Sequence, residues 1–116
     1  MIMDISIKRV YLPAEDSDGC RVLVDRLWPR GIKKEDAKVD LWAKTLAPSA
    51  ELRKWFNHIP ERFEEFSKKY VEELKANPEA APVLDELRRH DKVTLLYGAK
   101  DEQHNNAVVL LHLLTV

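Results

Sequence analysis

The chain has 116 residues, of which 45% are hydrophobic and 34% are charged. This length and apolar content predict one compact domain, residues 1–116, and argue against two full domains and against intrinsic disorder. Nineteen basic and twenty acidic side chains give a net charge of −1, so a uniformly basic surface for nucleic acid is absent, although a local basic patch stays open.

The cysteine content and the apolar runs predict a cytoplasmic protein with no membrane partner. Cys20 is the single cysteine, so no internal disulfide can form, which suits a reducing compartment. Asp4 stands where a secretory leader would carry a basic residue. The longest apolar run, 107–114, is interrupted by His112 and is far shorter than the roughly 20 residues that a bilayer requires.

Three segments have the patterns of β-strands. Residues 5–11 alternate between apolar and polar side chains, which is typical of a half-exposed strand. Residues 21–28 are β-branched and nearly continuously apolar, which indicates a strand buried on both faces and ended by Pro29 and Gly31. Residues 92–97 form the third predicted strand, and Gly98 ends it.

Residues 35–90, between the second and third strands, have helical patterns. Ser49 is the predicted N-cap of one helix, and a second helix follows from the apolar residues Phe63, Phe66, Tyr70 and Leu74, which recur at 3-4-4 spacing. A last helix is predicted to begin near Asp101.

These elements predict an α/β fold with a small, mostly parallel three-stranded sheet. A strand, a helical crossover and a second strand favour parallel pairing with a right-handed connection. The long helical crossover and the C-terminal helix would pack on the sheet. The pairing and direction of the first strand are not determined by the sequence.

Ligands of open α/β sheets collect beyond the carboxyl ends of the strands. Here the two strand exits are residues 25–31 and 97–106. At the second exit Lys100 precedes a predicted helix start, whose free N–H groups favour an anion. Asp101 would cap this helix, and His104 would act as a general acid or base. The alternative is that Asp101 is only a cap and His104 only a solvated residue.

The first exit contributes two guanidinium groups, Arg26 and Arg30, which suit bidentate binding of carboxylate or phosphate. Strand alternation would direct Asp25 and Arg26 to opposite faces. The alternative is a structural ion pair between Arg26 and Asp101, with Arg30 simply exposed.

Other chemistry has less support. The histidines at 58, 90, 104 and 112 are scattered, so we expect no metal site. His58 either reaches the site or simply precedes a helix. Cys20 has Asp16 and Asp18 as neighbours, which would raise its pKa, so a thiolate nucleophile is not expected.

Three strings of residues, 18–31, 47–56 and 94–105, resemble the YeaO-like family of the bacterial domain-of-unknown-function 488 group. The resemblance spans about residues 5–114. It implies a small α/β protein but no established reaction. Wider members of the group resemble one another in a Cys-His-Arg turn at the second exit, where this chain has residues 100–105 and no cysteine.

Some relatives carry a MarR-type regulator label. A winged helix-turn-helix, however, needs a recognition helix and a β-hairpin wing, and this chain is expected to end in a strand and a helix.

Three functional hypotheses follow. The first is a small enzyme or binding protein for an anionic small molecule (phosphorylated, nucleotide or carboxylate). Asp25 or Asp101 would orient a partner and His104 would move a proton, while the ligand would be held by Arg26, Arg30, Lys100, Tyr97, Asn105 and Trp28. The second is a nucleic-acid-associated regulator that uses Arg21, Lys33, Lys34, Lys38 and Lys44. The third is a non-catalytic interaction domain. The sequence names no substrate, cofactor or oligomeric state.

Overall fold

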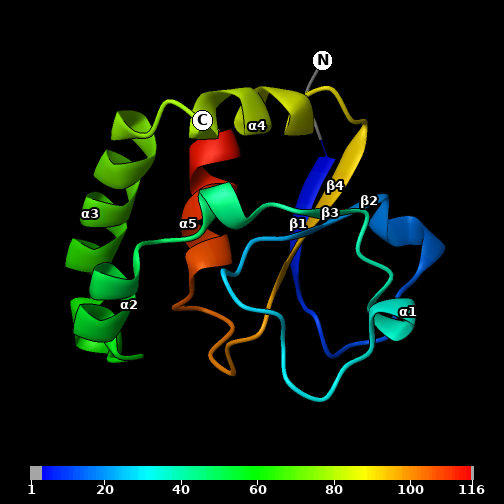
Figure 1. Cartoon of the computed structure of the whole chain (residues 1–116), viewed down its shortest axis with the longest axis horizontal. Helices are drawn as coiled ribbons and strands as arrows, with labels where there is room; N and C mark the ends of the chain where they lie inside the picture. The colour runs from blue at the N-terminus through cyan, green and yellow to red at the C-terminus, as the bar shows by residue number, and fades with distance from the viewer. Residues whose placement is uncertain (1–3, 116) are drawn as a thin grey trace.

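The computed structural model describes residues 4–115, so both ends of the predicted domain 1–116 lie outside the described residues. Four strands form one sheet in the order β1-β4-β2-β3 (Figure 1). All three pairings are parallel, which confirms the predicted α/β class. The strands are β1 (Asp4–Arg9), β2 (Cys20–Leu23), β3 (Leu41–Trp42) and β4 (Lys92–Tyr97).

The sheet has one strand more than the sequence predicts. β3 is only two residues long and pairs with the end of β2, so its pattern is too short to be recognised. The first strand, whose neighbour the sequence left open, lies parallel to β4. The predicted strand 21–28 ends at Leu23, because the chain turns away once Val24 has donated its N–H to the carbonyl of Leu96.

Five α-helices accompany the strands among residues 4–115: α1 (Lys34–Ala37), α2 (Ala50–Phe56), α3 (Phe63–Ala76), α4 (Ala80–Leu87) and α5 (Asn106–Thr115). α5 packs on β1 and β4, and α3 packs on the other side of α5, so that α5 lies between the sheet and α3 (Figure 1). Ser49 caps α2 as predicted, since its Oγ accepts the N–H of Leu52 at 3.1 Å.

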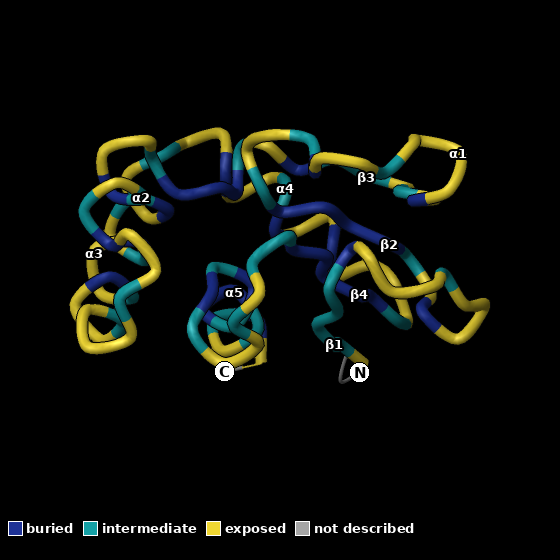
Figure 2. Tube along the Cα trace, turned by 90° about the horizontal axis from the view of Figure 1, so that it is seen from below, coloured by how far each residue is buried: buried dark blue, intermediate teal, exposed yellow. Residues whose placement is uncertain are grey.

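The two central strands, β2 and β4, are largely buried, as their dark trace in Figure 2 shows, whereas the outer strands β1 and β3 are mostly half-buried. Side chains alternate along a strand, so Val22 and Leu95 join the core under the helices. Leu23 and Leu96 join a second, smaller core, against which Trp28 and Trp42 pack. The segment that follows the first strand exit therefore covers the face opposite α5.

The last helix begins five residues later than predicted, at Asn106. Asn105 is its N-cap, because its Oδ1 accepts the N–H of Val108 at 3.0 Å. Asp101 caps the turn before the helix instead, where its Oδ1 accepts the N–H groups of Gln103 at 2.9 Å and His104 at 3.0 Å. Asp101 and Asn105 both have side chains that suit a helix N-cap. The prediction that Asp101 caps α5 is wrong, because Asn105 does so.

A buried ion cluster joins β1, β2 and the turn between them. Asp18 and Arg21 are only 6% and 4% exposed and form a direct ion pair. Lys8 also contacts the Asp18 carboxylate, at 3.2 Å. Burial alone would raise the pKa of Asp18, but hydrogen bonds from the Glu15 backbone and from both cations lower it overall. Arg21 is therefore not available for the phosphate contacts that the nucleic-acid hypothesis gave it.

We predict that Asp18→Asn destabilises the fold by about 3 kcal/mol, because it leaves the buried guanidinium group of Arg21 without its counter-charge. Asp85→Asn is the matched control, since it removes an exposed ion pair with Arg88, and should cost no more than about 0.5 kcal/mol. Urea unfolding measures both. Equal losses of unfolding free energy in the two variants would contradict this role for the cluster.

Candidate functional site

The two strand exits converge on a cavity of about 530 Å³ at the carboxyl edge of the sheet, which we call the carboxyl-edge cavity. One wall is formed by residues 25–27, directly after β2. A second wall is formed by Gly98, Ala99 and residues 104–106, between β4 and α5. The remaining wall comes from the crossover, chiefly from α2 and the turn that follows it.

Asp25 links the two exits. Its Oδ2 accepts the backbone N–H of Gly98 at 2.8 Å, and its Oδ1 accepts the Asn106 side-chain amide at 3.1 Å. The same amide also donates to the Val24 carbonyl at 2.9 Å. Any Cβ at position 98 would lie 3.2 Å from Asp25 Oδ2, so this close approach favours glycine.

Burial raises the pKa of Asp25, and the bonds from Gly98 and Asn106, together with the charges of Arg53 and His58, only partly offset that rise. The carboxylate has both oxygens engaged by protein donors. It therefore acts as a structural acceptor in the cavity wall, with no salt bridge to a cation among residues 4–115.

Three cations line the cavity: Arg26, Arg53 and Lys54. Within residues 4–115 none of them forms a salt bridge. The Nε of Arg53 is buried and has no hydrogen-bond partner in that part of the chain. A buried donor without a partner is costly, so the cavity wall holds a cationic donor that is not satisfied by the protein.

His104 and Asp101 form a coupled pair at the rim. Nδ1 of His104 lies 2.9 Å from Asp101 Oδ2, and the imidazole packs edge-on against Phe63 with centroids 5.2 Å apart. The hydrogen bonds from the Gln103 backbone and from His104 lower the pKa of Asp101. The carboxylate thus fixes the orientation of the ring, and His104 Nε2 is the nitrogen left to exchange a proton with a guest.

Four of the residues predicted from sequence line the cavity: Asp25, Arg26, His104 and Asn105. Asp25 and Arg26 both reach it although alternation was expected to separate them, because β2 ends before either residue. Asp101 touches His104 from behind. The expected ion pair between Arg26 and Asp101 is not formed.

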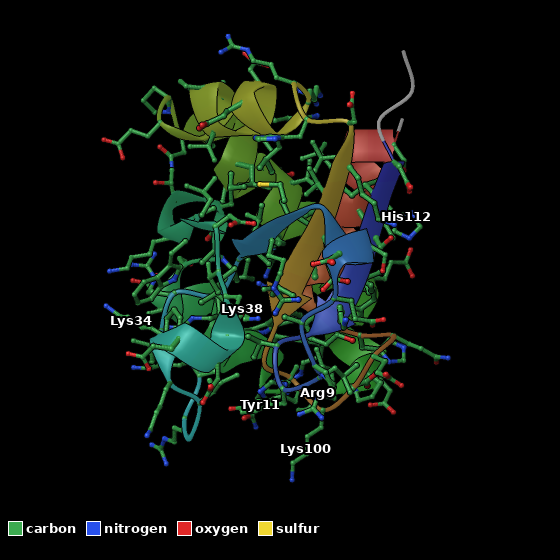
Figure 3. The ribbon with its side chains drawn as sticks, turned by 90° about the vertical axis from the view of Figure 1, so that its right-hand side faces the viewer. Arg9, Tyr11, Lys34, Lys38, Lys100 and His112 are labelled. Atoms are coloured by element: carbon green, nitrogen blue, oxygen red, sulfur yellow. The ribbon has the colours of Figure 1, made fainter. Side chains whose placement is uncertain are left out.

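Four other predicted residues do not line the cavity. Tyr97 is 2% exposed in the core, and Trp28 donates to the Ile32 carbonyl on the opposite face of the sheet. Arg30 is exposed beyond the turn. Lys100 extends away from the fold into solvent (Figure 3).

Sequence reasoning missed Arg53, Lys54 and Asn106 as site residues, and it left His58 open. All four line the cavity. The available signal was two adjacent cations in the last turn of α2, followed by Asn57 and His58, whose positive φ angles of 47° and 55° mark a tight turn. That turn brings the end of α2 to the strand exits.

The cysteine, the candidate metal ligands and the apolar helices of residues 4–115 are other features that could carry a function. Cys20 lies elsewhere in the fold, and its pKa is raised as predicted, although burial, Asp40 and Glu86 are the causes. Within residues 4–115 no group of three His, Cys, Asp or Glu side chains is arranged to hold a metal ion. No helix in the same range is long and apolar enough to cross a membrane.

We predict that Asp25 gives the stability of the fold a distinct pH dependence. Its pKa is raised above the ordinary value of 3.8, so the folded state binds this proton more tightly than the unfolded state does. The contribution of Asp25 to stability therefore rises as pH falls from its folded pKa toward 3.8, and it is lost as pH rises. Urea unfolding between pH 7 and pH 4 should show this rise in the wild type relative to Asp25→Asn. Parallel curves would contradict it.

Comparison with known proteins places the chain in a family. A family model described as the inactive DUF488-N3 subclade matches residues 4–116. The chain is 47% identical over 108 residues to the uncharacterized protein YeaO of Escherichia coli (strain K12), which covers 93% of this chain and 94% of that protein. It is 44% identical over 110 residues to the uncharacterized protein Rv3073c of Mycobacterium tuberculosis (strain ATCC 25618 / H37Rv), covering 95% and 92%. No solved structure matches. The chain belongs to the DUF488 family and resembles its YeaO-like members over 93% to 95% of its length.

Proposed function

We propose that this protein binds a small anionic molecule in the carboxyl-edge cavity. The observation that carries the proposal is the buried Nε of Arg53, a cationic donor in the cavity wall with no partner among residues 4–115. A guanidinium group binds carboxylate and phosphate oxygens in a bidentate manner. An anionic guest in the cavity would supply the counter-charge that this guanidinium group lacks among residues 4–115.

The charge of the wall supports the same conclusion. The lining has three positive charges, from Arg26, Arg53 and Lys54, and among residues 4–115 Asp25 is the one carboxylate in it. Both oxygens of Asp25 already accept hydrogen bonds from the protein. Three positive charges against one negative charge leave the lining with a net positive charge, whose field is stronger in a partly enclosed site than on an open surface.

The lining favours binding over nucleophilic catalysis. Among the described residues that form it, none is serine, threonine or cysteine, so the usual hydroxyl and thiol nucleophiles are missing. The matching family model is described as inactive, which agrees with a binding role. A general acid–base enzyme is the second candidate, because Asp101 orients His104 at the rim.

We predict that Arg53→Gln weakens the binding of inorganic phosphate about tenfold or more, because a charge-assisted hydrogen bond contributes about 1.5–3 kcal/mol. Isothermal titration calorimetry at constant ionic strength measures the affinity. Arg89→Gln is the matched control, since Arg89 is exposed just before β4, at the opposite edge of the sheet, and should leave the affinity unchanged.

Two results would reject the proposed function. One is the absence of phosphate binding to the wild type at millimolar concentration. The other is an equal loss of affinity in both variants, which would indicate a general effect of surface charge. For the second candidate, His104→Gln should abolish turnover of a substrate while leaving its binding intact.

A further inference from the structure

The carboxyl-edge cavity has an apolar side as well as a cationic side. Phe56 and Phe66 lie in its wall and stack on one another with ring centroids 4.3 Å apart. Leu27 lines it at the first strand exit and is 67% exposed. Phe56 and Phe66 are themselves buried, so Leu27 presents most of the apolar surface of these three residues. Covering that surface with a guest is favourable in proportion to the area removed from water.

The size of the cavity also argues for more than an isolated anion. Its volume of about 530 Å³ falls within the range of roughly 300–1,000 Å³ that is typical of pockets for small organic ligands. Inorganic phosphate alone would contact the cationic wall and leave the apolar wall in water.

The charges of the lining set the charge of the guest. Arg26, Arg53 and Lys54 contribute +3 and Asp25 contributes −1, which leaves +2 when the two lining histidines are neutral. A carboxylate would balance only half of this charge. A phosphate monoester carries nearly two negative charges at neutral pH and presents three acceptor oxygens.

We propose that the guest is a phosphate monoester of an aromatic or similarly apolar alcohol. The phosphate contacts the Arg53 side of the cavity, and the apolar body lies against Phe56, Phe66 and Leu27. This inference rests on the proposed function and goes further, because it fixes both the charge and the shape of the anion. Leu27 is then a specificity-determining residue that contacts the apolar body and not the phosphate.

The test compares four probes by calorimetry at pH 7.5 and constant ionic strength: inorganic phosphate, phenyl phosphate, benzoate and phenol. Phenyl phosphate should bind about tenfold tighter than phosphate, because the ring covers apolar wall, and about tenfold tighter than benzoate, which carries one charge fewer. Phenol should bind weakest of the four.

The variant Leu27→Ser tests the apolar contact. Leu27 is 67% exposed, so we expect the fold to tolerate the substitution. The affinity of this variant for phenyl phosphate should be about threefold lower than that of the wild type. Its affinity for inorganic phosphate should fall by less. Leu12→Ser is the matched control, because Leu12 is 46% exposed but lies outside the cavity. Its affinities for both probes should equal those of the wild type.

The outcomes separate the two proposals. If phosphate binds through Arg53 but phenyl phosphate binds no tighter, the proposed function stands and the apolar guest is rejected. If benzoate binds as tightly as phenyl phosphate, the dianionic head group is rejected. If neither phosphate nor phenyl phosphate binds, the proposed function fails and this inference fails with it.

Discussion

The buried carboxylate of Asp25 is the interaction on which the site depends. It joins the ends of β2 and β4 by accepting the backbone N–H of Gly98, a residue 73 positions further along the chain. Its other oxygen holds Asn106, the first residue of α5. A charge in this position is costly unless donors surround it, and both of these donors come from the second strand exit. One side chain therefore joins the two cavity walls that the strand exits form.

The same bonds explain why the cavity remains cationic. A free carboxylate at this point would pair with the guanidinium and ammonium groups around it. Because Asp25 is engaged by an amide and a backbone N–H, Arg53 keeps a buried nitrogen without a partner. The carboxylate of Asp25 thus positions the two strand exits. The positive charges of Arg53 and Lys54 on α2 then have no counter-charge from a salt bridge within residues 4–115, and an external anion can supply it.

The sequence predicted the parallel sheet and its two polar strand exits, because apolar periodicity and strand–crossover–strand order indicate where the strands end. It could not predict β3, which has two residues, or the true start of α5, because Asp101 and Asn105 are both suitable caps. Trp28 was assigned to the site because the strand was extended to it. The strand ends five residues earlier, and Trp28 packs on the opposite face. Arg53 was missed because only tertiary structure brings α2 to the strand exits.

The Nε–H group of Arg53 gives the most direct test of the account, because it is observable by ¹H–¹⁵N correlation NMR. Titration with inorganic phosphate should shift this resonance in a saturable manner, together with the backbone amide of Gly98, while the Nε–H of Arg89 stays in place. A shift spread evenly over exposed arginines and lysines, or an unmoved Arg53 resonance at saturating phosphate, would contradict an anion site at the carboxyl edge of the sheet.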